Sequence, residues 1–147
     1  MLTTHAKIPS IHWQDYQNIF VLTGAGISVG SGIPPFRGPG GLWNDEAMIK
    51  LVEIESLSSN PQGVWWLHSQ MREKIVAAQP NPGHTALAHL EAQLNPNQRF
   101  ILVTQNIDGL HQRAGSRNVV EYHGNVLHTC CTNPICDLPR YADNSLH

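Results

Sequence analysis

Three short apolar segments divide the chain, and polar or turn-forming residues bound each of them. They cover 18–23, 100–103 and 118–122 and are rich in β-branched and aromatic residues, which is typical of strands. The first two read as buried strands of a parallel sheet. Apolar residues recur at helical spacing over 61–78 and again over 85–93. Strands that alternate with helices predict an α/β fold with a parallel sheet.

The composition is that of a globular domain and excludes several classes of partner. The 147 residues are 41% hydrophobic and 14% charged, and their net charge is −2. Because there is no basic excess, we expect no nucleic-acid partner and no binding to lipid surfaces. No apolar run is long enough to cross a membrane. The first thirteen residues also lack the pattern of a secretory signal.

The cysteines favour a metal site over a disulfide framework. Cys130, Cys131 and Cys136 lie within seven residues, whereas a disulfide framework spreads its cysteines along the chain. The cluster therefore indicates a metal site or free thiols in a reducing cytosol, and we predict a cytoplasmic protein. Cys131 and Cys136 could supply half of a tetrahedral zinc site, but their spacing is loose and a second pair is absent.

A glycine-rich segment follows the first strand and continues for about twenty residues. It contains Gly24-x-Gly26-x-x-x-Gly30 and then two prolines before Arg37. Glycine after a buried strand lets the backbone approach a phosphate, and the next helix directs its N-terminus at the charge. The spacing is not that of the usual dehydrogenase fingerprint, so a tight strand-to-helix turn is the alternative. Arg37 would suit a phosphate or a carboxylate.

Two further polar segments follow the later strands. Gln105, Asn106 and Asp108 come after the second strand, where α/β folds place ligand contacts. They can bind a ribose, an amide or a water, or they can simply begin a helix with an Asx cap. His123 follows the third strand and could serve as a general base. A single histidine is more often structural, and the residues alone leave both possibilities open.

Taken together and in order, these motifs resemble the sirtuin (Sir2) family of NAD-dependent protein lysine deacylases. The resemblance extends from about Val21 to Cys136 and is specific, because several motifs match at matching separations. The matching segments are 23–28, 31–34, 36–38, 41–43, 80–84, 104–115 and 121–124.

The resemblance implies a ligand for each motif. NAD would lie with its pyrophosphate over Gly24, Ala25 and Gly26. Ser28 and Arg37 resemble the phosphate and ribose contacts of the family. Phe36 resembles the ring that shields the sugar carbon after nicotinamide leaves. Gln105, Asn106 and Asp108 resemble the residues that line the nicotinamide and ribose pocket.

The resemblance also implies a reaction. The acyl-lysine oxygen would attack the sugar carbon of NAD, and His123 would act as general base on a ribose hydroxyl. The products would be free lysine, nicotinamide and O-acyl-ADP-ribose. Because the base is a neutral imidazole, activity should fall on acidification. Zinc, held by Cys131, Cys136 and two further ligands, would be structural.

The acyl group should be neutral. Family members that prefer succinyl or malonyl groups carry a Tyr-x-x-Arg motif on the helix before the 80–84 motif. Those positions here are His68 and Met71, so the arginine for an acyl carboxylate is missing. Arg72 is one position along, which turns its side chain by about 100°. We therefore expect acetyl or another neutral acyl group; alternatively, His68 and Met71 simply pack or face solvent.

The predicted organisation is a Rossmann-like unit and part of a small zinc-binding subdomain. Residues 1–17 form a lead-in, 18–128 the NAD-binding unit, and 129–147 the start of the subdomain. A complete family member continues with a second cysteine pair and further strands, so we expect a fragment or a truncated product whose sheet exposes an apolar face and edge.

Two alternatives to a deacylase remain open. An ADP-ribosyltransferase or NAD hydrolase would use the same NAD pocket with a different acceptor. A catalytically inactive fragment would act through binding alone.

Overall fold

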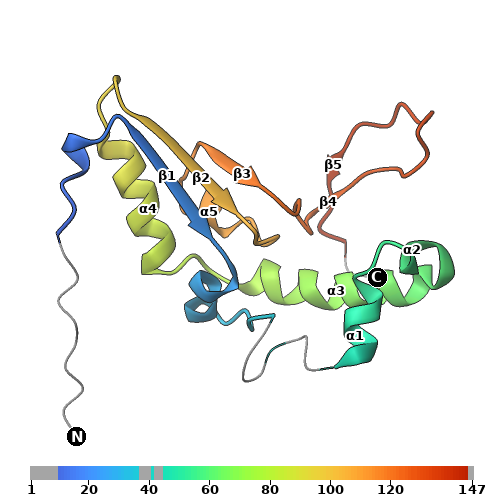
Figure 1. Cartoon of the computed structure of the whole chain (residues 1–147). Helices are drawn as coiled ribbons and strands as arrows, with labels where there is room; N and C mark the ends of the chain where they lie inside the picture. Colours follow the sequence, from blue (N-terminus) through green and yellow to red (C-terminus); the bar gives the residue numbers. More distant parts are fainter. Residues whose placement is uncertain (1–9, 37–40, 42–44, 146–147) are drawn as a thin grey trace, which may run out of the picture.

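The computed structural model describes residues 10–36, 41 and 45–145 (Figure 1). These residues form an α/β unit and a small antiparallel hairpin. The elements, in chain order, are η1 (Trp13–Asp15), β1 (Asn18–Thr23), η2 (Ala25–Ser31), α1 (Glu46–Leu51), α2 (Ser56–Ser59), α3 (Pro61–Ala77), α4 (Pro82–Gln93), β2 (Arg99–Thr104), α5 (Leu110–Arg113), β3 (Val119–Glu121), β4 (His128–Thr129) and β5 (Tyr141–Ala142).

The central sheet is parallel and has the strand order β1-β2-β3, as the sequence predicts. The register pairs Thr23 with Thr104, and Thr104 with Glu121. The three strands therefore end at the same edge of the sheet. The segments that follow them leave from neighbouring positions, which is where parallel α/β sheets bind ligands.

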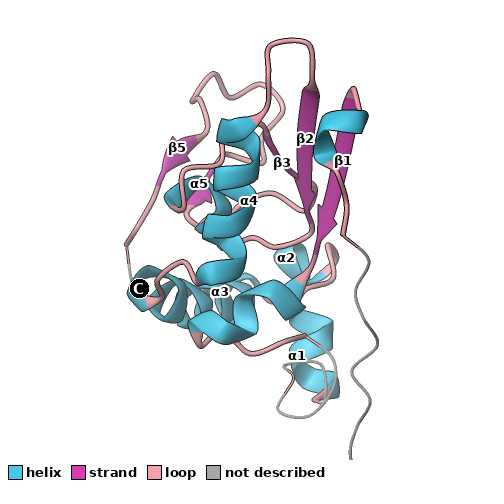
Figure 2. Cartoon of the chain, turned by 90° about the vertical axis from the view of Figure 1, so that its left-hand side faces the viewer, coloured by secondary structure: helices cyan, strands magenta, loops and turns pink. Residues whose placement is uncertain are grey.

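Helices α4 and α5 lie against one face of the sheet, and α1, α2 and α3 lie beyond the carboxyl ends of the strands (Figures 1 and 2). The core sits between the sheet and these two helices. Its buried members include Ala88 of α4, Leu110 of α5, and Phe100 and Leu102 of β2.

The opposite face of the sheet is exposed among the described residues. Phe20 is 67% exposed and Leu22 59%, and Ile101 and Val120 on the neighbouring strands are also exposed, at 47% and 50%. The prediction that residues 18–23 form a strand is confirmed, but the strand is half-buried on one face and exposed on the other. The reason is the alternation of side chains across a sheet that α4 and α5 cover from one side.

Helix α4 begins three residues before the predicted start at residue 85. Pro82 occupies its first turn, and the Asn81 side chain accepts a hydrogen bond from the Gly83 N–H at 2.9 Å. The His84 side chain in turn accepts from the Asn81 N–H, which completes a capping box. The apolar periodicity leaves residues 80–83 between two predicted helices, because the cap is polar and adds nothing to that periodicity.

The hairpin of β4 and β5 is short and antiparallel, and it carries the three cysteines in its loop. No helix among the described residues is long and apolar enough to cross a membrane. Helices α1 and α2, which the sequence analysis did not predict, precede α3 and pack against it.

Candidate functional site

The glycine-rich segment is fastened to the segment that follows β2. The Ser28 hydroxyl, in η2 and 1% exposed, donates to Asp108 Oδ2 at 2.7 Å. Asn106 Nδ2 donates to Ser28 Oγ at 3.0 Å and to the Gly24 carbonyl at 3.1 Å. Asp108 Oδ1 accepts from the Leu110 N–H at 2.9 Å, which fixes its carboxylate. Four of the predicted site residues are thus joined in one hydrogen-bonded cluster.

Two buried histidines lie beneath this cluster. His84 Nε2 lies 3.5 Å from Ser28 Oγ, and because His84 Nδ1 accepts from the Asn81 N–H, Nε2 carries the proton. His111 Nε2 lies 2.9 Å from Thr23 Oγ1, and the two imidazoles meet edge to face at 4.8 Å. Two buried imidazole rings therefore pack against the hydrogen-bonded cluster.

Both imidazoles are held neutral. Burial and, to a smaller extent, the neighbouring His84 lower the pKa of His111 to about 4, against the opposing influence of Asp108. Burial likewise lowers the pKa of His84, again against the influence of Asp108. A charge at either ring would be expensive to bury.

A pocket opens between this cluster and α3. Six predicted site residues line it, namely Ala25, Ser28, Phe36, Met71, Asn106 and Asp108. Asn106 Oδ1 is buried and finds no hydrogen-bond partner among the described residues. A buried acceptor without a partner is costly, so a donor on a bound ligand, such as an amide or a hydroxyl, would satisfy it. The residues present therefore fit an NAD-type ligand.

His123 is oriented by the backbone of the segment after β2. Its Nδ1 lies 3.0 Å from the Gln105 carbonyl oxygen, which can only accept, so Nδ1 carries the proton. The Nε2 lone pair is then available to accept a proton from a ligand. The side chain is exposed, and the Tyr122 ring lies 5.1 Å away, edge to face.

The remaining predicted residues lie beside the pocket or apart from it. Gly24 adjoins Gln105, since a Cβ at Gly24 would lie 3.7 Å from Gln105 Oε1, and Gly26 leaves open space where its side chain would be. His68 does not line the pocket, and its Nδ1 donates to the Val64 carbonyl at 2.7 Å. Arg37 lies outside the described residues.

Most of the pocket-lining residues of α3 were not predicted from the sequence. Leu67, Gln70, Lys74 and Ile75 line the pocket together with Met71. Residues 67, 70, 71 and 74 follow the spacing of one helical face, so this periodicity could have revealed them. Among these residues, Lys74 has the largest effect on the chemistry of the pocket, because it is the one cationic side chain among the lining residues that the structure describes.

The cysteines lie in the loop between β4 and β5, away from the residues that line the pocket. A hydrogen bond from the Asn133 backbone and another with the Cys136 side chain lower the pKa of Cys131. The two thiols are adjacent, as a shared metal would require. Among the described residues, however, no group of three or more histidine, cysteine or acidic side chains is placed to hold a metal ion.

Comparison with known proteins identifies the family. The model of the Sir2 family matches residues 24–144. The chain belongs to the Sir2 family. The fold of this sirtuin agrees with that of an ADP-ribose complex of a mutant Sir2 homologue, with a TM-score of 0.79 and 39% identity over 89% of this chain and 50% of the other. A Sir2 homologue in complex with NAD gives a TM-score of 0.76 at 40% identity, over 89% and 49% of the two chains.

Relatives among characterised sequences carry the name of an NAD-dependent protein deacylase. The protein from Aquifex aeolicus is 49% identical over 84% of this chain and 50% of its own length. The mitochondrial sirtuin-5 of Canis lupus familiaris is 39% identical over 85% of this chain and 43% of its own length. This sirtuin chain therefore spans about half the length of the curated relatives it matches.

Proposed function

We propose that this sirtuin removes acyl groups from protein lysine side chains in an NAD-dependent reaction. The observation that carries the proposal is the convergence of three segments at one edge of the sheet. These segments supply a glycine-rich turn hydrogen-bonded to Asn106, a pocket that contains the unsatisfied Asn106 acceptor, and an imidazole whose Nε2 can accept a proton. Membership of the family and the names of its relatives support the same reaction.

The predicted site residues would share the binding of NAD. Gly24, Ala25 and Gly26 would bring backbone close to the pyrophosphate, and Ser28 and Arg37 would contact the phosphates and ribose. Asn106 and Asp108, together with Gln105, would bind the carboxamide and ribose end, and Phe36 would cover the same end. When bound, NAD supplies the sugar carbon that accepts the acyl oxygen as nicotinamide departs.

His123 acts as the general base. The Gln105 carbonyl fixes the proton on Nδ1, so Nε2 takes a proton from a hydroxyl of the bound sugar. The imidazole performs this step only when neutral, and activity therefore falls on acidification. The exposed position of His123 leaves room for an acyl-lysine side chain to approach from solvent.

The acyl group is a neutral one, of which acetyl is the simplest. Met71 lines the pocket with a thioether where an arginine would bind an acyl carboxylate. Arg72 does not replace it, because its guanidinium is buried and bonded to Val126 and Asp143 on another side of α3. This arrangement of α3 supports the proposal of a neutral acyl group.

Lys74 favours a second candidate, an acyl group that carries a carboxylate. Lys74 lies about one turn beyond Met71 and also lines the pocket, so its ammonium could pair with such a group, although as a point charge rather than a bidentate fork.

Competition between acetyl-lysine and succinyl-lysine peptides, with NAD in excess, tests both candidates. We expect faster removal of acetyl, and a reversed preference in the Met71→Arg variant. Val76→Arg is the matched control, because it adds the same cation to an exposed position of α3 outside the pocket. Faster removal of succinyl by the unmodified protein, abolished by Lys74→Met, would establish the second candidate instead.

The site of zinc is also a proposal. Cys131 and Cys136 supply two thiolates, and a closed structural site needs two further ligands. In this arrangement residues 18–128 form the NAD-binding unit, and 129–147 belong to a zinc-binding subdomain in a cytoplasmic protein.

A further inference from the structure

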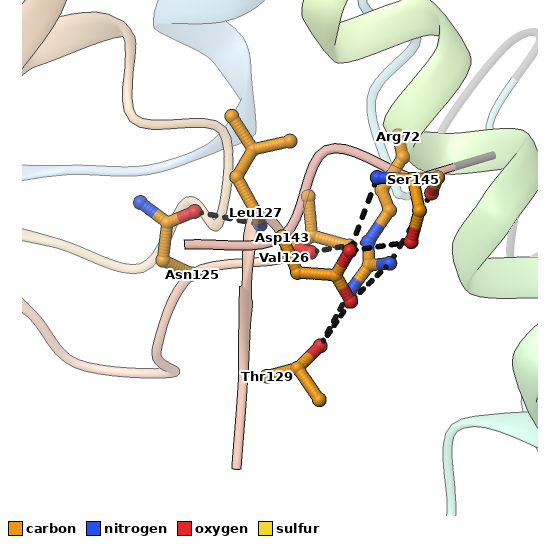
Figure 3. Close-up of polar contacts among 7 residues, drawn as sticks. All are labelled: Arg72, Asn125, Val126, Leu127, Thr129, Asp143 and Ser145. Carbon is orange, nitrogen blue, oxygen red and sulfur yellow. Dashed lines mark hydrogen bonds and ion pairs between the residues drawn. The ribbon is translucent and has the colours of Figure 1, made fainter. Parts of the chain in front are cut away.

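Arg72 lies at the centre of a partly buried polar cluster that has no role in the proposed reaction (Figure 3). The side chain belongs to α3 and is 3% exposed. Its Nε donates to the Val126 carbonyl at 2.7 Å, and one Nη donates to Thr129 Oγ1 at 2.8 Å. The other Nη donates to Asp143 Oδ2 at 3.0 Å. The guanidinium thus ties α3 to the hairpin of β4 and β5 and to the segment before it.

Val126 connects this cluster to the opposite wall of the pocket. It is buried, and its N–H donates to the Ile107 carbonyl at 3.0 Å while its own carbonyl accepts from Arg72. Ile107 lines the pocket beside Asn106, and Met71, the neighbour of Arg72, lines it from α3. One residue therefore joins the two walls from behind, through a hydrogen bond on each side of its backbone.

The orientation of Arg72 is fixed from several directions. Asp143, its ion-pair partner, also accepts from Thr129 Oγ1 at 2.7 Å and from the Ser145 N–H at 3.1 Å. The Trp65 ring lies 5.6 Å from the guanidinium carbon. These contacts fix the orientation of the planar guanidinium. The position of α3 is therefore coupled to the positions of Val126 and of the hairpin.

We propose that Arg72 is a positioning residue that sets the separation of the two pocket walls, and with it the length of acyl chain that the pocket admits. The pocket-lining side chains of α3 move together if the helix shifts or rotates. The bonds from Arg72 to Val126 oppose such a movement relative to Ile107. This inference rests on the proposed function for its effect on acyl-chain selectivity, but the link between the walls is independent of catalysis.

The test compares Arg72→Met and Arg72→Lys with Arg140→Met. Arg140 is a matched control, because it lies in the loop of the hairpin that Arg72 contacts, its side chain is 47% exposed, and its described ion pair, with Glu121, is longer at 3.6 Å. Amide hydrogen exchange of Val126 is measured relative to Leu102 in β2, and kcat/KM is compared for acetyl-lysine and butyryl-lysine peptides.

We expect both Arg72 variants to accelerate exchange at Val126 at least tenfold while exchange at Leu102 changes little. The ratio of kcat/KM for acetyl over butyryl should fall at least threefold, through KM rather than kcat. Arg140→Met should change neither quantity. If Arg72→Met fails to fold, Arg72→Lys decides, since it retains the charge and loses the fork.

A folded Arg72 variant with unchanged exchange at Val126 would overturn the link between the walls. Accelerated exchange with an unchanged acetyl-to-butyryl ratio would reduce Arg72 to a purely structural role. If the unmodified protein removes no acyl group, the proposed function fails, and the exchange measurement alone decides whether Arg72 holds the walls together.

Discussion

His123 shows how a backbone group prepares a side chain for chemistry. The Gln105 carbonyl can only accept a hydrogen bond, so it fixes the proton on Nδ1 and leaves Nε2 free. The same segment carries Asn106, whose buried Oδ1 awaits a donor. At the scale of single residues, the site thus presents two hydrogen-bond acceptors, His123 Nε2 and Asn106 Oδ1. A ligand with hydroxyl or amide donors would satisfy both of them.

Replacement of His123 by asparagine should remove most of the activity without unfolding the protein. General-base catalysis contributes about 10²- to 10⁴-fold, and the exposed side chain adds little to stability. Nicotinamide release in the presence of acetyl-lysine peptide measures the loss, and thermal unfolding reports on the fold. His89→Asn, at an exposed position of α4 outside the pocket, should retain activity. Equal rates for the two variants would remove His123 from the mechanism.

The buried imidazoles predict an acid-sensitive fold. The pKa of His111 is lowered from 6.5 to about 4, so the unfolded chain binds the proton more readily than the folded one. Stability is therefore complete above about pH 6.5 and decreases as the pH falls towards 4. At about 1.4 kcal/mol per pKa unit, the loss by pH 4.5 is about 2–3 kcal/mol.

Urea unfolding between pH 7 and 4.5 measures this loss. The His111→Asn variant should lose less stability over the same range, because the asparagine does not titrate. An identical pH dependence in the two proteins would show that His111 is not its source.

At the scale of elements, Asn81 links the cap of α4 to the glycine-rich segment. Its Oδ1 caps α4 through the Gly83 N–H, and its Nδ2 donates to the Ile27 carbonyl at 2.7 Å and to Ser31 Oγ at 2.9 Å. The start of α4 and the position of η2 therefore depend on one side chain. This explains why the helix begins earlier than its apolar periodicity predicts.

Asn81→Ala should cost both stability and affinity for NAD. Loss of the helix cap and of the hydrogen bonds to η2 should lower the free energy of unfolding by about 1–3 kcal/mol. Asn60→Ala is the matched control, because Asn60 caps α3 through the Gly63 N–H at 3.0 Å and makes no described bond to η2. Calorimetric titration with NAD should show weaker binding for Asn81→Ala only; equal weakening in both would show that general destabilisation is responsible.

The strands and the long helix α3 were predictable from periodicity, because each buries one regular face. The first strand was predicted with its observed limits of Asn18 and Thr23. The positions of Ala25, Ser28, Asn106 and Asp108 in one pocket also agree with the motifs. The position of Lys74 in the pocket wall and the hydrogen bonds of Arg72 were not predicted. Both depend on which side of α3 faces the hairpin, and the local sequence does not carry that information.

At the scale of the whole molecule, the sheet is covered on one side only among the described residues. Parallel sheets are ordinarily covered on both faces, and this chain spans about half the length of the relatives it matches. Phe20, Leu22, Ile101 and Val120 form a continuous apolar surface on the other side, because the register brings them together. The predicted exposure of an apolar face is confirmed.

This surface should make the isolated chain bind apolar dyes and self-associate. Phe20→Ser should lower both the fluorescence of a bound dye and the sedimentation coefficient at high concentration, because it interrupts the surface. Ile54→Ser is the control, since Ile54 is 76% exposed and lies between α1 and α2, away from the sheet. Equal effects of the two substitutions would show that the exposed face of the sheet is not the source of dye binding and self-association.

The proposed NAD-dependent deacylation is tested by mass spectrometry of an acetyl-lysine peptide that has been incubated with the protein and NAD. We expect the peptide to lose its acetyl group, nicotinamide to appear in equal amount, and the His123→Asn variant to lose most of both activities. A peptide or protein that gains ADP-ribose, nicotinamide release without loss of acetyl, or intact NAD in the presence of folded protein would each contradict it.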